Sequence, residues 1–298
     1  MSSSNSSRGR TNSGRWSRLK HINQDPLEVI GWPSKGDNNF GLLDYKTQET
    51  FYTRIVERYM AFCSDASQGD ELIRRLAKMS LSTTSEPNSE PIDNSQKDIV
   101  ALIMAIRKLR EGIIASRRID DFSIQAFIFS IRLSISIKHM ESFHTAILHL
   151  LKSMHPVQPL ASTEKQEFVS YLVLDLACRQ DELAEAYFVR NQYQIHDTKI
   201  DAVLKALTHD NFFLFWKVKR TVDGHRAKLM EFAEDELRKQ TLKCLGRSYL
   251  IMDLPSLEKY TQSTWHSLKQ NFSPVKSKSS PSSGAGVNTE YALIHITM

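Results

Sequence analysis

Residues 208–220 read THDNFFLFWKVKR and place four aromatic side chains, Phe212, Phe213, Phe215 and Trp216, beside a short run of basic residues. Such a cluster can serve as hydrophobic core, as an exposed anchor for a partner, or as a base-stacking platform beside a basic strip. On a helix, Phe212, Phe215 and Trp216 lie within one arc, because residues three and four positions apart share a face. We interpret these three residues as core and Phe213, which lies off that arc, as a candidate partner contact.

The chain around this cluster has the composition of an all-α protein. Of its 298 residues, 41% are hydrophobic and 24% are charged, which is ordinary for a globular protein. Between Ile92 and Leu254 there are only two prolines and three glycines. Strands need frequent turns, and turns recruit Gly and Pro, so this long stretch favours helices.

Apolar residues at three- and four-residue steps predict the individual helices. Consecutive amphipathic helices with short joins pack as antiparallel pairs, so we predict an α-solenoid. Capping side chains mark four predicted helix starts, at Asp120–Asp121, Thr163 with Gln166, Asp197 and Ser263. The predicted apolar stripes are Phe51, Ile55, Tyr59 and Phe62; Leu72, Leu76 and Met79; Ile99, Leu102, Ile103, Ile106, Leu109 and Ile113; Val169, Leu172, Val173 and Leu176; Ile200, Val203, Leu204 and Leu207; and, on one long helix, Leu229, Ala233, Leu237, Cys244 and Leu245.

One segment fits two patterns. In FSIRLSISIK, residues 129–138, apolar residues at 131, 133, 135 and 137 alternate with polar ones, as in a strand. Ile124, Phe127, Ile128, Ile131 and Ile135 also form a helical face. Periodicity leaves both readings open, and the helical neighbours on both sides favour a helix.

The last 45 residues change character. LPSLEKYT and STWHSLKQNF predict two short helices, a Ser-, Pro-, Gly- and Lys-rich loop follows, and YALIHITM at 291–298 predicts a strand. This order is typical of a small winged-helix module with a long wing at 273–289. We therefore divide the chain into a disordered basic tail and irregular arm (1–44), N-terminal helices (45–81), a flexible linker (82–96), a helical-repeat part (97–252) and the winged-helix-like module (253–298).

The order of motifs around the aromatic cluster resembles the PCI superfamily. Asn211-Phe212-x-x-Phe215-Trp216-x-Val218 is similar to the Asn-aromatic-x-x-Phe-Phe-x-Leu signature on the last solenoid hairpin of one branch. In that branch a long helix with an arginine follows, and then a tyrosine before the winged helix; Arg238 and Tyr249 occupy those places. Trp216 departs from the second phenylalanine of the signature. The resemblance implies that the signature residues belong to the core, namely Asn211, Phe212, Phe215, Trp216, Arg238 and Tyr249. Upstream, residues 105–123 resemble the first helix pair of the branch.

This branch is shared by GANP-type mRNA-export scaffolds and by the small PCI subunits of three eukaryotic complexes. These are the proteasome lid (the PSMD-eight type), the signalosome (subunit eight) and translation initiation factor three (subunit k). The resemblance covers residues 97–298 and implies a non-catalytic scaffold that contacts other PCI proteins through solenoid surfaces and winged-helix strands. A terminal strand at 291–298 would supply an edge for β-augmentation, with Tyr291, Leu293 and His295 as candidate partner contacts.

A second function class, binding of RNA, stays open. The net charge of +5 belongs to residues 1–20, which hold five basic and no acidic residues, so the remainder is formally neutral. A GANP-like scaffold would contact RNA through this tail, the second short helix and the wing. The candidate nucleic-acid contacts are Arg8, Arg10, Arg15, Arg18, Lys20, Lys269, Lys276 and Lys278.

Motifs for enzymatic chemistry are missing from the sequence. There is no P-loop, HExxH or GxSxG, and glycine is too scarce for a dinucleotide fingerprint. His139, His144 and His149 cannot share a helical face, because five-residue steps rotate by about 140°. We expect no catalytic residue, metal, cofactor or small-molecule substrate.

The cysteines and the apolar runs bear on the compartment. Cys63, Cys178 and Cys244 are widely spaced with mostly apolar neighbours, which is typical of packed, reduced thiols. No uncharged apolar run approaches the roughly 20 residues of a membrane span. We expect a soluble protein of the nucleus or cytoplasm.

Overall fold

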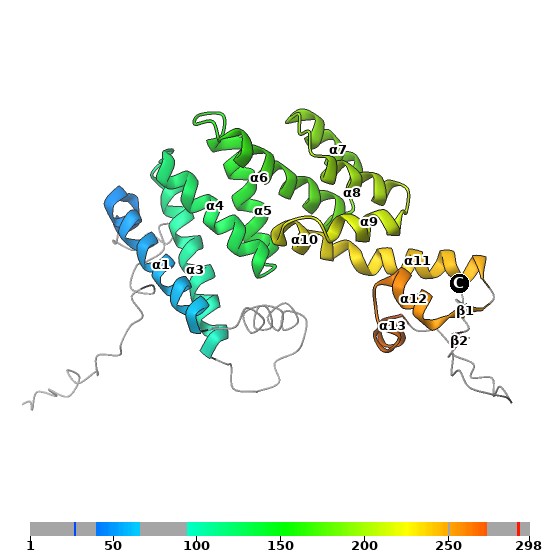
Figure 1. Cartoon of the computed structure of the whole chain (residues 1–298). Helices are drawn as coiled ribbons and strands as arrows, with labels where there is room; N and C mark the ends of the chain where they lie inside the picture. The colour runs from blue at the N-terminus through cyan, green and yellow to red at the C-terminus, as the bar shows by residue number, and fades with distance from the viewer. Residues whose placement is uncertain (1–26, 28–39, 66–93, 250, 273–290, 293–298) are drawn as a thin grey trace, which may run out of the picture. The chain divides into compact units, whose positions relative to one another are not determined.

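The computed structural model describes residue 27 and residues 40–65, 94–249, 251–272 and 291–292 (Figure 1). The described part is mostly helical, with helices packed in pairs. It divides into two compact units, one of Met1–Ser67 with Glu90–Arg118 and one of Gln68–Ser89 with Ile119–Met298. The predicted helix around Leu72, Leu76 and Met79 lies outside the described residues.

The first unit is built on two long helices, α1 (Tyr45–Asp65) and α3 (Asn94–Ala115), preceded by the 3-10 turn η2 (Phe40–Leu43). Phe51, Ile55 and Phe62 of the predicted stripe are buried, and α1 and α3 pack against each other. α3 begins at Asn94, inside the predicted linker 82–96, and it belongs with α1 although residue 97 was predicted to open the later repeat part.

Gly112 allows a close approach within this unit. A Cβ on Gly112 would lie 2.7 Å from the carbonyl oxygen of Leu42 and 2.8 Å from its Cβ. Real Cβ atoms do not approach so closely, so the turn η2 packs onto α3 only because this residue lacks a side chain. Gln48, which is also buried, donates to the Leu42 carbonyl at 2.8 Å and to Ser116 Oγ at 2.9 Å.

The second unit contains consecutive helices that pack against one another: α4 with α5, α6 with α7, and α8 with α9. α6 also contacts α10, whose N-cap residue is Asp223. The helices and turns in order are α4 (Asp121–Ser136), α5 (Met140–His149), η3 (Leu150–Met154), α6 (Ser162–Leu174), η4 (Asp175–Arg179), α7 (Leu183–Gln192), α8 (Thr198–Thr208), α9 (Phe212–Lys219), α10 (Gly224–Met230), η5 (Glu231–Ala233), α11 (Glu234–Ser248), α12 (Leu254–Thr261) and α13 (Trp265–Asn271).

The segment with two possible patterns is helical. Residues 131–136 lie in α4, and Ile131, Leu133 and Ile135 are all buried. A helix that is buried on most of its circumference loses the one-sided stripe that distinguishes it from a strand. Two of the alternating polar residues, Ser130 and Ser134, are buried as well, so the alternation does not mark a solvent-exposed face.

Two of the four predicted caps are confirmed. The Asp120 carboxylate accepts from Ser123 N at 2.8 Å, and the Asp197 carboxylate accepts from Lys199 N at 2.9 Å. The other two predictions were wrong by one or two residues: α6 follows Ala161, whose N–H donates to Glu164 at 3.3 Å, and α13 is capped by Thr264. Neighbouring Ser, Thr and Glu residues offered equivalent side chains at both places.

The long helix predicted from Leu229 to Leu245 is interrupted. The 3-10 turn η5 separates α10 from α11, while Leu229, Ala233, Leu237 and Leu245 all remain buried. The apolar periodicity continues across η5, so periodicity alone does not reveal that the helix type changes there. Cys244 was predicted as a packed residue of this stripe and is exposed instead.

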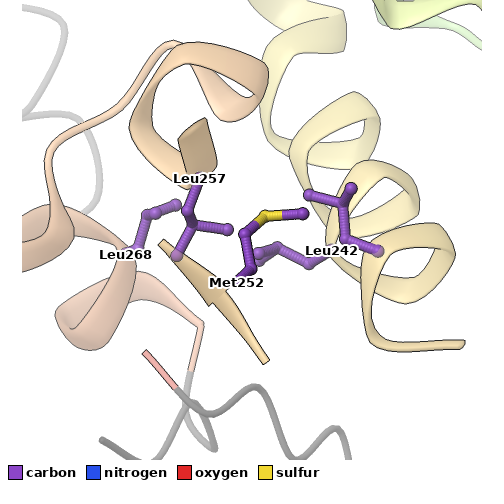
Figure 2. Packing of buried hydrophobic residues seen from close by; sticks show 5 residues of the cluster. Leu242, Met252, Leu257 and Leu268 are labelled. Atoms are coloured by element: carbon purple, nitrogen blue, oxygen red, sulfur yellow. The ribbon is translucent and has the colours of Figure 1, made fainter. Parts of the chain in front are cut away.

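The C-terminal part gathers around one small apolar core (Figure 2). This core, which we call the C-terminal cluster, consists of Leu242 and Leu245 of α11, Met252, Leu257 of α12 and Leu268 of α13. Two residues, Met252–Asp253 (β1), pair antiparallel with Tyr291–Ala292 (β2). The predicted strand 291–298 is described only at Tyr291–Ala292, and the predicted wing 273–289 lies outside the described residues.

Asp253 belongs to two elements. Its backbone pairs with Tyr291 in the strand register, and its carboxylate accepts from Ser256 N at 3.0 Å as the N-cap of α12. Hydrogen bonds from the side chain and the backbone of Ser256 lower the pKa of Asp253.

No helix in the ranges that the structure describes is long and apolar enough to cross a membrane.

Candidate protein-interaction site

The aromatic cluster lies on α9, and its residues divide between the interior and the surface. Asn211 is the N-cap of this helix, and its side-chain oxygen accepts from Leu214 N at 3.0 Å. Phe215 and Trp216 are buried, Phe212 is half-buried, and 57% of Phe213 is exposed. α9 therefore presents one aromatic face inward and one aromatic residue outward.

Trp216 is the centre of the inward face. Its ring is perpendicular to that of Phe215 at 5.4 Å between centroids. The guanidinium of Arg238 lies 5.3 Å from the Trp216 ring centroid and the amine of Lys219 lies 6.0 Å from it. The indole Nε1 is buried and finds no hydrogen-bond partner within the described part of the chain. The ring is therefore held by packing and by cation–π contacts.

Arg238 joins three helices. From α11 it stacks on Trp216 of α9, and its Nε donates to the Thr261 carbonyl of α12 at 3.2 Å. The other guanidinium nitrogens donate to Glu234 at 2.7 Å and to Asp235 at 3.1 Å, one turn earlier on α11. A planar guanidinium with several fixed donors can make all these contacts together, which a lysine ammonium cannot.

Glu234 is the acidic counterpart of this junction. Its carboxylate accepts from Arg238 and also from Lys219, which reaches over from α9. Only 13% of the Glu234 side chain and 16% of the Arg238 side chain are exposed. Charges this far from water stay paired, because an isolated buried charge is costly. We call Trp216, Lys219, Glu234, Arg238 and Thr261 the junction.

A second aromatic contact lies beside the junction. The ring centroids of Phe212 and Phe213 are 4.4 Å apart, and Tyr260 of α12 lies 5.3 Å from Phe213 at an interplanar angle of 78°. Edge-to-face rings of this kind add a specific contact to ordinary apolar burial. The ring of Phe213 is therefore contacted by two other rings although most of it is exposed.

Tyr249, assigned to the core by the family signature, is not in the core. α11 ends at Ser248, and the extended conformation at Tyr249 leaves this side chain 54% exposed, outside the C-terminal cluster. Ile251, two residues further on, is 59% exposed. Two large apolar side chains therefore face solvent directly before β1.

The remaining predicted contact residues are less informative. Lys269 lies on α13 with its amine 4.8 Å from the ring centroid of Trp265 on the same helix. Tyr291 is described by its backbone, which pairs with Asp253. Outside the described residues lie Arg8, Arg10, Arg15, Arg18, Lys20, Lys276, Lys278, Leu293 and His295.

The histidines of interest occupy three separate environments. His139 caps α5 by accepting from Ser142 N, His144 Nδ1 lies 3.7 Å from Asp175, and His149 packs on Phe127. In the ranges that the structure describes, no three His, Cys, Asp or Glu side chains are arranged to hold a metal ion.

Cys178 is buried in the π-helical turn η4, where burial and the neighbouring Asp175 raise the pKa of its thiol to about 12. A thiol with so high a pKa is a poor nucleophile. Asp175 itself is fully buried and accepts both guanidinium bonds of Arg179, at 2.5 and 2.8 Å. These groups support the packing of η4.

Sequence reasoning missed Lys219, Glu234, Tyr260 and Thr261. The spacing of Glu234 and Arg238, four residues apart on one helix, was the available signal for a local ion pair. The contact of Phe213 with Tyr260 joins residues 47 positions apart, and no local pattern predicts it.

The sequence matches no protein-family model and no curated protein.

Proposed function

We propose that this chain is a non-catalytic PCI-type scaffold subunit that assembles with other PCI proteins in a complex of the proteasome-lid, signalosome or initiation-factor-three type. The observation that carries the proposal is the junction: the Trp216 of the signature on α9 stacks on the Arg238 of the following helix, and Arg238 holds the end of α12. Within the proposal, α4–α9 form the solenoid and β1, α12, α13 and β2 form the winged-helix module.

The exposed residues before β1 support assembly through this module. Tyr249 and Ile251 are large and exposed directly before the short strand β1, which pairs with β2. Apolar side chains beside a strand edge are typical of surfaces that are covered in a complex. The proposed localisation is the nucleus or cytoplasm, and the proposed partners are proteins.

Affinity purification of the tagged full-length chain from its native cells, with and without nuclease, tests this function. We expect PCI subunits to co-purify and to survive nuclease. The variant Tyr249→Ser/Ile251→Ser should lose them, whereas the matched variant Val100→Ser/Met104→Ser, which changes two exposed residues of α3, should retain them. A chain that purifies alone would contradict the scaffold role.

Partners that disappear with nuclease would favour the GANP-like role in mRNA processing or export. The described residues give this alternative little support, because Lys269 is the one predicted RNA contact among them and its amine lies over Trp265. RNA binding through several phosphates would also weaken steeply between low and moderate salt.

A further inference from the structure

The outward face of α9, together with its C-cap residue Arg220, carries an aromatic residue followed by two cations. Phe213, Lys217 and Arg220 lie at positions i, i+4 and i+7, and all three are exposed. With a rise of about 1.5 Å per residue, the two charges lie about 6 and 10 Å along the helix axis from Phe213. We call these three residues the basic-aromatic stripe.

The positive charge of the stripe is not neutralised within the described part of the chain. Neither the Lys217 ammonium nor the Arg220 guanidinium makes an ion pair or hydrogen bond there, in contrast to Lys219, which pairs with Glu234. Exposed Lys259 follows on α12, directly before Tyr260. In the sequence, Asp210 lies three residues before Phe213, and Asp223, which pairs with Arg226, lies three residues after Arg220.

Phe213 has the properties of a binding anchor. Its ring is mostly exposed but held by Phe212 and Tyr260 from two sides. An ordered aromatic side chain loses little conformational entropy on binding, and such residues are common at the centre of protein interfaces.

We propose that the basic-aromatic stripe binds an acidic amphipathic segment of a partner protein. An apolar side chain of that segment packs on Phe213, and two carboxylates face Lys217 and Arg220. In a helical segment these residues have the same four- and seven-residue spacing as the stripe.

The geometry favours a peptide over a nucleic acid. A base-stacking platform needs an open ring face, and Phe212 lies against Phe213 at only 4.4 Å and 33°. A nucleic-acid strand also needs a row of cations for its phosphates, whereas the stripe offers two. Two cations and one apolar anchor match a short acidic segment.

This inference rests on the proposed scaffold role for its biological setting, and the two can fail separately. The co-purification described above depends on Tyr249 and Ile251. The following experiment depends on α9.

Selection of a random 16-residue peptide library on the full-length chain tests the stripe. We expect enriched peptides with an apolar residue followed by acidic residues four and seven positions later. Phe213→Ser should weaken binding of a selected peptide by about tenfold. Lys217→Glu/Arg220→Glu should select basic residues at the same two positions, and the matched variant Lys239→Glu/Lys243→Glu on α11 should select the same acidic peptides as the parent chain.

Two outcomes would overturn the proposal. The first is a set of selected peptides that is not enriched in acidic residues, or that stays the same when the stripe variants are used although circular dichroism shows their fold to be intact. The second is binding of a single-stranded RNA 12-mer that is lost in Lys217→Glu/Arg220→Glu, which would assign the stripe to nucleic acid.

Discussion

The guanidinium of Arg238 lies 5.3 Å from the ring centroid of Trp216 and at the same time donates to the last carbonyl of α12. One side chain thus contacts the last helix of the paired helices and the first helix of the C-terminal part. Its position on α11 makes this helix a common support for both.

Arg238→Ala should destabilise the C-terminal part. The substitution leaves Glu234 with Lys219 alone and removes the contacts to Trp216 and Thr261, so we expect a loss of about 2–4 kcal/mol in the free energy of unfolding. Hydrogen exchange of the α11 and α12 amides should accelerate. Arg238→Lys should recover only part of the loss, because an ammonium cannot reproduce the planar fork.

The control for this prediction is Lys239→Ala. Lys239 pairs with Glu236 at 3.1 Å, but both side chains are more than half exposed, so its loss should cost less than about 0.5 kcal/mol. Equal exchange rates in Arg238→Ala and the parent chain would show that the junction does not hold α12.

Trp216→Phe should be tolerated. The substitution removes the buried indole N–H that lacks a hydrogen-bond partner, and this gain offsets the smaller ring surface under Arg238. We expect a change within about 1 kcal/mol in urea unfolding, against about 3–5 kcal/mol for Trp216→Ala. A large loss in Trp216→Phe would mean that the full indole is needed for packing.

Gly112→Ala should destabilise the first unit. The added methyl would overlap the Leu42 carbonyl and Cβ, and overpacking of this kind costs about 1–3 kcal/mol, more than the gain in helix propensity. Gly224→Ala is the matched control, because a Cβ there meets nothing within 4 Å. Thermal unfolding should therefore shift down for the first variant only.

Stability should fall as the pH drops below neutrality, partly through His225. Burial lowers the pKa of His225, which packs near Tyr171 at 5.9 Å between ring centroids. The unfolded chain, with a histidine pKa near 6.5, then binds more protons than the folded one. Stability present above about pH 6.5 is therefore lost as the pH falls through the folded pKa.

In His225→Gln, the free energy of unfolding should depend less steeply on pH, as measured by urea unfolding between pH 7.5 and 5. His155, whose pKa is also lowered by burial, would account for part of the remaining slope. The exposed His209→Gln serves as control. An unchanged pH dependence in His225→Gln would assign the loss to other groups.

The sequence predicted the helices well where one face of each helix is apolar. Phe51, Ile55 and Phe62, and likewise Ile200, Val203 and Leu204, are buried at the predicted spacing. Prediction was ambiguous in α4, which is buried on most sides, and it failed at η5, where the helix type changes without a change in period. Local patterns carry no information about either environment.

The site was predictable only in part. A helical arc correctly placed Phe215 and Trp216 inside and Phe213 outside, whereas Phe212, predicted with the first two, is only half-buried. The contacts of Phe213 with Tyr260 and of Arg238 with Thr261 depend on how α12 packs against its neighbours, and the exposure of Tyr249 depends on where α11 ends. The position of a residue in the sequence does not predict such tertiary contacts.

Asp253 makes the strand pairing and the start of α12 interdependent. Its backbone sets the register opposite Tyr291, and its carboxylate fixes the first turn of the helix through Ser256. A slip of β1 by one residue would place another side chain at the cap position and carry Met252 out of the C-terminal cluster. Strand pairing and helix capping therefore form one cooperative unit, because neither can shift without the other.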